Sequence, residues 1–272
     1  MSFRCPVCSD ELCKKEKVML CPNGHSFDIA AKGYVNLLLN NSSGAKRHGD
    51  DRLMINARRD FLSKGFYEPL REAVYGFVGD GFPSGGTLLD AGCGECWYTS
   101  YFKRRLDESG LSPEVLGVDI SKFALEKAQK NCGVERAVAS IFKLPVADES
   151  CDALVNIFAP ACPEEFYRVL KSGGRLIKAI PLERHLWELK AAVYDEPYEN
   201  EVPPAELEGF TLEDSRDVAY EFSLESNRDI TDLFNMTPYC YKTSQSDREK
   251  LEKLETLSVS ASFRVLVYRK NN

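Results

Sequence analysis

Long hydrophobic runs are missing from this chain of 272 residues. No apolar stretch approaches the roughly 20 residues that a membrane-spanning helix needs, so we expect neither such a helix nor a membrane partner. The first residues reach Cys5 without the apolar core of a secretory signal peptide, and internal repeats and low-complexity tracts are also absent. The length suffices for one large core with a small appendage. We therefore expect a cytoplasmic protein.

Cysteine, in contrast, is abundant, with ten residues. In a reducing compartment, clustered cysteines indicate metal binding rather than disulfides. Two short pairs stand near the N-terminus, separated by twelve residues: Cys5-x2-Cys8 and Cys21-x3-His25. Two tight turns facing each other provide a tetrahedron of soft ligands, which suits a structural Zn²⁺ ion. Cys13 has no partner at this spacing and is left out of the ligand set.

The residues around these pairs favour turns. Pro6 and Pro22 follow the first cysteine of each pair, and Asn23-Gly24 gives the backbone freedom for a sharp turn before His25. Buried thiols in a small β-hairpin are the alternative without metal, and iron is an alternative to zinc.

Basic residues are fewer than acidic ones, 35 against 42, which gives a formal net charge of −7. This net charge alone argues against a nucleic-acid partner. The distribution changes that conclusion, since residues 1–60 carry ten Lys and Arg against seven Asp and Glu, and residues 61–272 carry 25 against 35. A basic front on an acidic body suits a polyanion that meets one face only. Solvated surface lysines are the alternative. Eight of these ten Lys and Arg, with His48, form three groups: Lys14, Lys15 and Lys17; Lys46, Arg47 and His48; Arg52, Arg58 and Arg59.

From residue 52 onward, helix-like and strand-like patterns follow one another. Apolar spacing predicts helices at 53–63, 66–78, 97–105, 122–131, 162–170 and 185–194. Short apolar runs predict strands at 87–94, 115–121, 136–140, 151–158, 172–181, 217–224 and 260–269. This succession predicts an α/β fold with a parallel, doubly wound sheet. Residues 40–51 read as a polar linker, and residues 195–209 as an irregular acidic stretch.

A glycine turn follows the first predicted strand, in LLDAGCGECWYTS. Gly92 and Gly94 let ligand atoms approach the backbone, and Asp119 ends the next strand, where a carboxylate can bind ribose hydroxyls. An NAD site shares these elements, but the third glycine of its fingerprint is missing and the spacing to Asp119 exceeds the usual roughly 20 residues. S-adenosylmethionine (SAM), with a ribose and an amino-acid tail but no pyrophosphate, fits better. A purely structural glycine turn is the remaining alternative.

Four segments resemble the successive motifs of class I SAM-dependent methyltransferases: LLDAGCGECWYTS, LGVDIS, LPVADESCDALV and VLKSGGRLI. Further segments resemble the rRNA large-subunit methyltransferase A family: CPVC, CPNGHSFDIAAKGYVNLL, GDDRLMINARRDFLSKGFYEPL, FAPAC, PLERHLWELK and LFNMTPY. This resemblance covers nearly the whole chain. It implies a Rossmann-like methyltransferase domain behind a small zinc-binding domain, and methyl transfer to N1 of a guanine in a hairpin of 23S rRNA.

The resemblance also implies the site residues. Zinc would be held by Cys5, Cys8, Cys21 and His25, and the SAM site would be lined by Tyr67, Gly94, Glu95, Asp119 and His185, together with Gly92 of the glycine turn. Cys96 departs from the family, which has glycine there, and its side chain should narrow the approach to the methionine tail of SAM.

We divide the chain into a zinc-binding domain at 1–39, a linker at 40–51 and a methyltransferase domain at 52–272. A 23S rRNA hairpin is the expected partner, and a homodimer is the oligomeric state to test.

The catalytic base is not identified by the sequence. Guanine N1 must lose its proton to become nucleophilic, and no carboxylate is singled out by its spacing. Phe158, after the fourth strand, could stack on a flipped guanine, and Asn156 could hydrogen-bond its edge; a buried strand end is the alternative. Two other functions stay open: a zinc-stabilised RNA-binding or ribosome-assembly protein with a degenerate SAM site, and a small-molecule methyltransferase.

Overall fold

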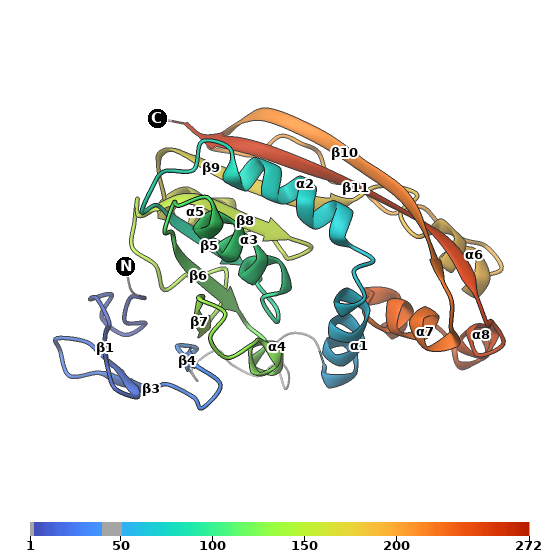
Figure 1. Cartoon of the computed structure of the whole chain (residues 1–272), viewed down its shortest axis with the longest axis horizontal. Helices are drawn as coiled ribbons and strands as arrows, with labels where there is room; N and C mark the ends of the chain where they lie inside the picture. Colours follow the sequence, from blue (N-terminus) through green and yellow to red (C-terminus); the bar gives the residue numbers. More distant parts are fainter. Residues whose placement is uncertain (1–2, 40–50, 272) are drawn as a thin grey trace.

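The computed structural model describes residues 3–39 and 51–271, and an eight-stranded sheet forms its centre (Figure 1). Neighbouring strands are parallel from β9 to β4, whereas β11 and β10 are antiparallel. The predicted α/β fold with a parallel sheet is confirmed. The spatial order of the strands is β10 (Phe210–Leu224), β11 (Leu257–Lys270), β9 (Leu170–Pro181), β8 (Cys151–Ile157), β5 (Thr87–Ala91), β6 (Glu114–Asp119), β7 (Glu135–Val138) and β4 (Tyr34–Asn36).

The strand order reverses at β5, which has β6 on one side and β8 on the other. Every residue of β5 is buried, as a central parallel strand requires. At such a switch point the connections leave the carboxyl ends of the two neighbouring strands in opposite directions and open a crevice for ligands. The glycine turn predicted from the sequence lies at this point.

Helices cover both faces of the sheet. On one face, Leu70, Phe102 and Ile230 belong to a core shared by most of the helices. On the other face, Phe166 of α5 and Tyr268 of β11 belong to a second core. The helices are α1 (Arg52–Ser63), α2 (Glu68–Gly79), α3 (Trp97–Glu108), α4 (Lys122–Lys127), α5 (Pro163–Val169), α6 (Trp187–Val193), α7 (Asn227–Asn235), the 3-10 helix η1 (Pro238–Tyr241) and α8 (Gln245–Leu251). None of these described helices has the length and apolar character that a membrane crossing requires.

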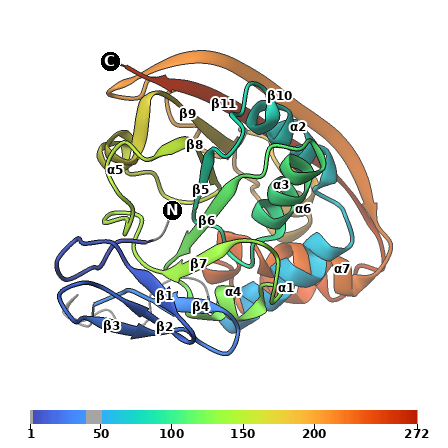
Figure 2. The same ribbon diagram turned by 60° about the vertical axis from the view of Figure 1, so that its left-hand side comes forward.

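The N-terminal unit is a three-stranded antiparallel sheet of β1 (Cys13–Lys15), β2 (Val18–Leu20) and β3 (Ser26–Asp28), which lies next to β7 and β4 (Figure 2). Its buried side chains, including Phe3 and Met19, share the second core with Leu144 of the body. The backbone N–H of Arg4 also donates to the carbonyl of Pro145 at 2.8 Å. The zinc-binding unit is therefore packed onto the body.

Strand β4 ties the two units together, because it lies within the predicted N-terminal domain yet pairs in parallel with β7 at the sheet edge. Residues 40–50 of the predicted linker lie outside the described residues. Its last residue, Asp51, caps α1 by accepting a hydrogen bond from the Met54 N–H at 2.9 Å. The division at residues 39 and 51 stays a prediction.

Several element boundaries differ from those expected. The predicted helix 122–131 ends at Lys127, since Ala128 takes an extended conformation and Asn131 and Gly133 have positive φ angles. Strand β10 begins at Phe210, seven residues before the predicted 217. Helices α7 and α8, which were not predicted from the sequence, begin at serine caps, Ser226 and Ser244.

Candidate active site and metal centre

The glycine turn joins β5 to α3 and is held against the end of β6. The N–H groups of Gly92 and Cys93 both donate to the carbonyl of Val118, at 2.8 and 3.1 Å. Gly92 has φ +98°, and a Cβ there would lie 2.4 Å from the Cβ of Ala159. Only glycine fits at this position, because both the backbone angle and the neighbouring loop exclude a side chain.

Asp119 ends β6 beside this turn. Its Oδ2 accepts a hydrogen bond from the Gly94 N–H at 2.8 Å, and its Oδ1 accepts one from the Ser121 N–H at 2.7 Å. These two backbone bonds fix the direction of the carboxylate at the carboxyl end of β6, beside the glycine turn. The predicted ribose-binding carboxylate is therefore oriented by the backbone.

Glu95 and Arg58 flank the turn with opposite charges. Glu95 is 9% exposed, directly after Gly94. A Cβ added to Gly94 would lie 3.8 Å from Nη1 of Arg58, which extends to the turn from α1. Burial is the main cause that raises the pKa of Tyr98; the Glu95 charge raises this pKa further, and the Arg58 charge lowers it. Arg58, which was predicted to be part of the basic front with Arg59, lies at the glycine turn instead.

Tyr67 and His185 form a buried pair on the other side of the crevice. The Tyr67 Oη lies 3.3 Å from Nε2 of His185, and Nδ1 of His185 accepts a hydrogen bond from the Ser262 N–H at 3.2 Å. Burial lowers the pKa of His185 to about 3, so the imidazole is neutral. Because Nδ1 is the acceptor, the single ring proton is on Nε2, from which it can be donated to the Tyr67 oxygen.

The loop after β8 connects the two halves of the site. Ala159 packs against Gly92, and the ring centroid of Phe158 lies 6.5 Å from that of Tyr67. Phe158 has φ +54° and remains 45% exposed. A large, exposed aromatic side chain in a strained backbone conformation is typical of a functional position. The six predicted cofactor residues thus lie on two sides of one loop.

Asn156 does not match its predicted part in base recognition. It is 1% exposed, and its Nδ2 donates to the carbonyls of Ala91 and Pro160 at 2.9 and 3.1 Å. The side chain holds the loop that carries Phe158, so the alternative of a buried strand end applies to Asn156 but not to Phe158.

Cys96 is the N-cap residue of α3 and has a left-handed conformation, with φ +61°. Glycine adopts this conformation without steric cost, which explains why a glycine would suit the position. The Cys96 side chain is 1% exposed and packs in the first core with Cys93. The cysteine therefore strains the backbone of the turn, whereas its thiol points into the core.

Asp90 is a buried carboxyl group that precedes the glycine turn, and it was not among the predicted site residues. It is 2% exposed and accepts a hydrogen bond from the Thr99 hydroxyl. Burial, with the nearby Asp119 charge, raises the pKa of Asp90 to about 7. Its position two residues before Gly92 could have indicated a functional carboxylate. Its burial, however, cannot be derived from the sequence alone.

The metal centre is formed by the four predicted ligands, Cys5, Cys8, Cys21 and His25, whose ligand atoms all lie within 4.8 Å of one another. The sulfur of Cys8 lies 3.7 Å from that of Cys21, and the His25 Nδ1 lies 3.2 to 3.6 Å from the three sulfurs. Tetrahedral zinc with bonds of about 2.3 Å to sulfur requires ligand separations of roughly 3.8 Å, so the cluster fits the ion.

The predicted turn chemistry of the metal centre is confirmed. Gly24 has φ +83°, and its N–H donates to the carbonyl of Cys21 at 3.0 Å. A hydrogen bond from Asn23 lowers the pKa of Cys8 to about 7, which favours the thiolate that zinc requires. Cys13 is exposed on β1, outside the cluster, as expected.

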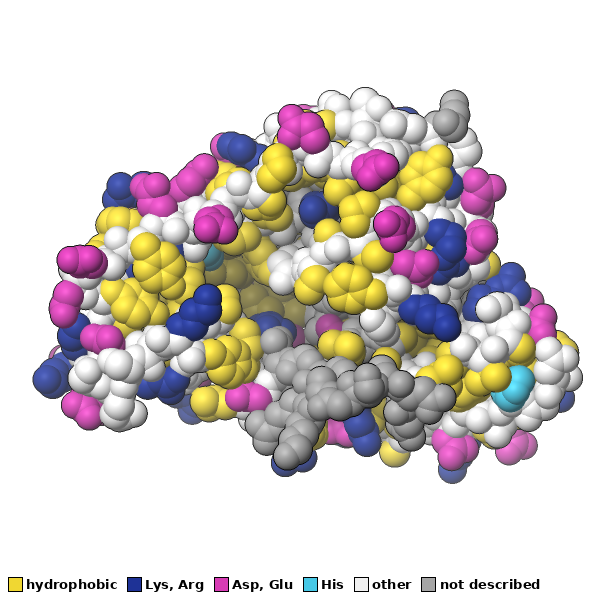
Figure 3. Space-filling model, turned by 180° about the vertical axis from the view of Figure 1, so that it is seen from behind, with side chains coloured by type: hydrophobic (Ala, Val, Ile, Leu, Met, Phe, Trp, Pro, Cys, Tyr) yellow, Lys and Arg dark blue, Asp and Glu magenta, His cyan; other side chains and the backbone are white. Residues whose placement is uncertain are grey.

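A hollow with a hydrophobic floor opens on the face seen in Figure 3, and Lys and Arg side chains lie around it. Of the predicted basic groups, Lys14, Lys15 and Arg59 are exposed, and Arg52 stacks its guanidinium 4.4 Å from the centre of the Phe123 ring. The group of Lys46, Arg47 and His48 lies outside the described residues.

Comparisons with known proteins agree with this site. Residues 3–42 match a family model described as RlmA, N-terminal, a zinc ribbon, and residues 89–178 match a model described as Methyltransferase domain. Among curated proteins, the chain is 30% identical to a putative 23S rRNA (guanine-N(1)-)-methyltransferase of Bacillus subtilis, over 97% of this chain and 96% of the relative.

It is also 35% identical to a 23S rRNA (guanine(748)-N(1))-methyltransferase of Streptomyces fradiae, over 70% of this chain and 67% of that protein. A crystal structure of the YcgJ protein from Bacillus subtilis has a similar fold, with a TM-score of 0.50 and 14% identity over 74% of this chain and 99% of YcgJ. The zinc ribbon, the SAM-methyltransferase fold and the relatives show together that the chain belongs to the rRNA large-subunit methyltransferase A family of SAM-dependent 23S rRNA guanine-N1 methyltransferases.

Proposed function

We propose that this protein transfers the methyl group of SAM to N1 of a guanine in a hairpin of 23S rRNA. The observation that carries the proposal is the meeting of two half-sites at one loop. Gly92 packs on Ala159 at the cofactor side, and Phe158 packs on Tyr67 at the aromatic side. A cofactor bound at the turn and a base stacked on Phe158 would then be neighbours.

SAM, when bound, supplies a methyl group that is already activated by the positive sulfur, so the protein has to align the reactants and manage charge. Asp119 accepts hydrogen bonds from the ribose hydroxyls, and Gly92 and Gly94 let the cofactor approach the backbone. Arg58 would bind the carboxylate of the methionine tail, and Glu95 would bind its ammonium group. These two residues have the complementary charges for a zwitterion beside Gly94.

The aromatic half-site receives the base. Phe158 is 45% exposed and offers a ring face to a flipped guanine, since every base has an extended π surface. The neutral His185 holds Tyr67 by a hydrogen bond, so Tyr67 keeps its own proton available as a donor. We assign Tyr67 and His185 to positioning at the boundary between cofactor and base.

The zinc ribbon contributes the positive surface for the phosphates. Lys14, Lys15 and Lys17 are exposed on and after β1, and residues 61–272 are strongly acidic. Long-range attraction would bring the RNA to the ribbon first. The reaction belongs in the cytoplasm, where rRNA is made and modified. A homodimer stays a prediction, which light scattering after size exclusion would measure.

Incubation of the protein with methyl-labelled SAM and separate fractions of rRNA, tRNA and small metabolites tests the proposal. Label should enter 23S rRNA, and digestion should release it as N1-methylguanosine. Label in small metabolites alone would favour a small-molecule methyltransferase. Binding of rRNA without any transfer would favour a ribosome-assembly protein with a degenerate site, for which the strained Cys96 is the relevant feature.

A further inference from the structure

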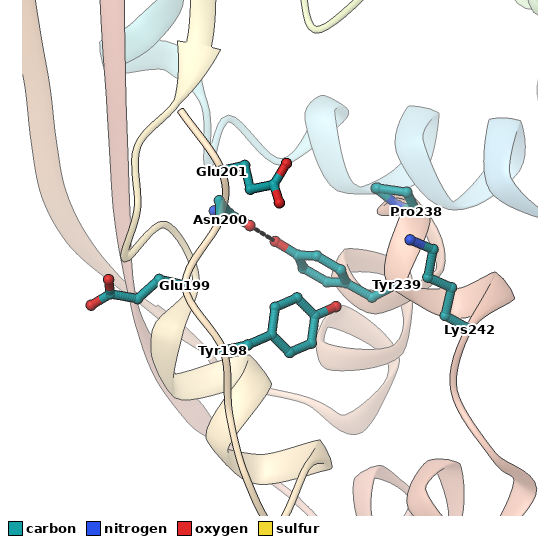
Figure 4. A pocket seen from close by; sticks show the side chains of 7 residues that line it. All are labelled: Tyr198, Glu199, Asn200, Glu201, Pro238, Tyr239 and Lys242. Carbon is teal, nitrogen blue, oxygen red and sulfur yellow. Dashed lines mark hydrogen bonds between the residues drawn. The ribbon is translucent and has the colours of Figure 1, made fainter. Parts of the chain in front are cut away.

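A second pocket lies away from the glycine turn, between the irregular segment 198–201 and η1. It has a volume of about 340 Å³ and is lined by Tyr198, Asn200, Glu201, Tyr239 and Lys242, together with Glu199 and Pro238 (Figure 4). It joins the irregular acidic stretch at 195–209 to Pro238 and Tyr239 of LFNMTPY, a segment that resembles the family and has no part in the proposed reaction. The volume is at the lower end for a small-molecule site, which suits a single nucleoside rather than a longer segment.

The two tyrosines that line the pocket, Tyr198 and Tyr239, are supported by the buried Lys190. Lys190 is 1% exposed, and its Nζ donates to the Tyr198 carbonyl at 2.8 Å and to Oδ1 of Asn200 at 2.7 Å. The same ammonium lies 4.5 and 4.9 Å from the ring centres of Tyr198 and Tyr239. A buried charge with this many partners fixes a chain segment that has no regular secondary structure.

Asn200 connects the pocket wall to the active site. Its Oδ1 accepts a further hydrogen bond from the Tyr239 hydroxyl at 2.9 Å, and its Nδ2 donates to the carbonyl of Leu182 at 2.9 Å. Leu182 precedes His185 by three residues, so the pocket and the Tyr67–His185 pair share one supporting loop. The position of a ligand in the pocket is thereby fixed relative to the Tyr67–His185 pair.

The polar groups at the rim have a definite arrangement. In Figure 4, the Glu201 carboxylate points toward the pocket above Tyr239, Lys242 stands on the opposite side, and Glu199 points away. Tyr198 keeps 45% of its surface exposed, so its ring is available for stacking. The pocket therefore offers an aromatic face, an acceptor of two hydrogen bonds and a positively charged donor.

We propose that this pocket binds an unpaired guanine of the RNA substrate, other than the guanine that is methylated. The guanine ring stacks on Tyr198, the Glu201 carboxylate accepts from its N1–H and its N2 amino group, and Lys242 donates to its O6. Guanine is the base whose Watson–Crick edge has two adjacent donors next to an acceptor. Because the carboxylate covers N1, this base is read rather than methylated. The inference rests on the proposed RNA substrate.

The first test compares variants of the full chain in equilibrium binding to a 23S rRNA hairpin and in methyl transfer. Tyr198→Ala should weaken RNA binding by roughly tenfold, the usual scale for removal of one base stack, and should raise the KM for RNA with little change in kcat. Tyr198→Phe keeps the ring and should restore binding. SAM affinity and the melting temperature are the controls for folding. Binding by Tyr198→Ala that equals the wild type would overturn the proposal.

The second test identifies the base. Each unpaired guanine of the hairpin is replaced in turn by inosine, which lacks the N2 amino group. One replacement, at a position other than the methylated one, should weaken binding to the wild type by about tenfold and leave binding to Glu201→Gln unchanged. Glu199→Gln has the same charge change in the same segment and should respond like the wild type.

If no inosine position depends on Glu201, or if it is the methylated one, the inference is wrong while methyl transfer to rRNA can remain. If the wild type transfers no label to rRNA at all, the proposed function itself has failed. If the variants instead lose only binding to a ribosomal protein, the pocket belongs to a protein contact and the nucleobase assignment is overturned.

Discussion

Arg58 and Arg59 show how far two adjacent residues can differ in function. They are neighbours on α1, and both lie off its apolar stripe, so their sequence context is the same. Arg59 is exposed and pairs with Asp60 at 2.6 Å, whereas Arg58 is half-buried with its guanidinium at the glycine turn. A helix advances about 100° per residue, which directs the two side chains to different surroundings.

The two arginines should therefore separate in mutagenesis. Arg58→Ala should raise the Kd for SAM by about tenfold, because the variant cannot form a charge-assisted bond to the methionine carboxylate, and should leave the salt dependence of RNA binding unchanged. Arg59→Ala, the matched control, should keep SAM affinity. Titration of SAM with each purified variant by calorimetry measures the difference. Equal SAM affinities for the two variants would contradict the role of Arg58 in SAM binding and would favour its original assignment to the basic front.

Asp119 gives a second prediction at this scale. Asp119→Ala should weaken SAM binding by about 1.5–3 kcal/mol, the range for a hydrogen bond to a charged group. Asp119→Asn should lose less, because its amide oxygen can still accept from the Gly94 or the Ser121 N–H. Isothermal titration with SAM reports both values. Unchanged affinity in Asp119→Ala would mean that the ribose contacts another residue.

Asp90 predicts a pH dependence of stability. Burial raises its pKa to about 7 in the folded chain, above the unfolded value near 4, so folding favours the neutral carboxyl group. This contribution is complete below the unfolded pKa and is lost as the pH rises through about 7. Asp90→Asn lacks the titration, so its stability relative to wild type should increase by a few kcal/mol between about pH 4 and pH 8.

Thermal melting of both proteins across this range measures the effect. Asp80→Asn, at an exposed position, provides the control and should follow the wild type at every pH. Parallel curves for wild type and Asp90→Asn would show that Asp90 does not change its protonation state in this interval.

At the scale of elements, the sequence predicted the glycine turn, the acid at the end of β6 and the zinc cluster, because each depends on residues close together in the chain. The segment AAKGYVNLLL was predicted as a turn and a short strand or packing segment, and β4 lies within it. The place of β4 in the main sheet was not predicted, since it pairs with β7 about 100 residues later. Helix α7 has a helical pattern that the sequence analysis overlooked, since Ile230, Leu233 and Phe234 are buried at i, i+3 and i+4. Helix α8 has one buried residue, Leu251, so periodicity gave no signal there. The pocket beside η1 is lined by residues 198–201 and 238–242, which no local pattern brings together.

The zinc ribbon should also stabilise the methyltransferase body against unfolding. Its core side chains pack with Val118 and Leu144 of the body, and β4 extends the main sheet, so the two units share buried surface. Removal of zinc by a chelator, or Cys8→Ala, should lower the melting temperature of the whole chain and abolish RNA binding, while SAM affinity changes little. Metal analysis should find about one zinc per chain.

Cys13→Ala is the matched control for the ribbon, because Cys13 is an exposed thiol outside the cluster, and it should retain zinc and RNA binding. Calorimetric scans with and without chelator give the melting temperatures. A chain without zinc as purified would contradict the metal assignment. Unaltered melting after chelation would mean that the ribbon and the body unfold independently.

For the whole molecule, the separation of charge decides how RNA approaches. The part after residue 60 carries 25 basic against 35 acidic residues and repels a polyanion, whereas the ribbon presents Lys14, Lys15 and Lys17 on and after β1. RNA binding releases condensed counterions in proportion to the phosphates that the protein neutralises, so affinity should fall steeply with salt. The aromatic half-site at Phe158 and the pocket at Tyr198 then select the nucleotide position on the RNA. The ribbon determines the association rate and contributes the phosphate contacts.

Replacing Lys14, Lys15, Lys17 and Arg59 together by alanine should thus weaken 23S rRNA binding and flatten its dependence on salt, by roughly one unit of slope for each phosphate that the variant no longer neutralises. SAM affinity should stay constant, because none of the four lies at the glycine turn. A control that removes four lysines of the body, Lys103, Lys122, Lys143 and Lys253, changes the net charge equally and should alter the slope less. The measurement is binding of a labelled hairpin at four or more salt concentrations. If the slope falls equally in both quadruple variants, the RNA responds to the total charge of the protein, and the ribbon has no special part in gripping it.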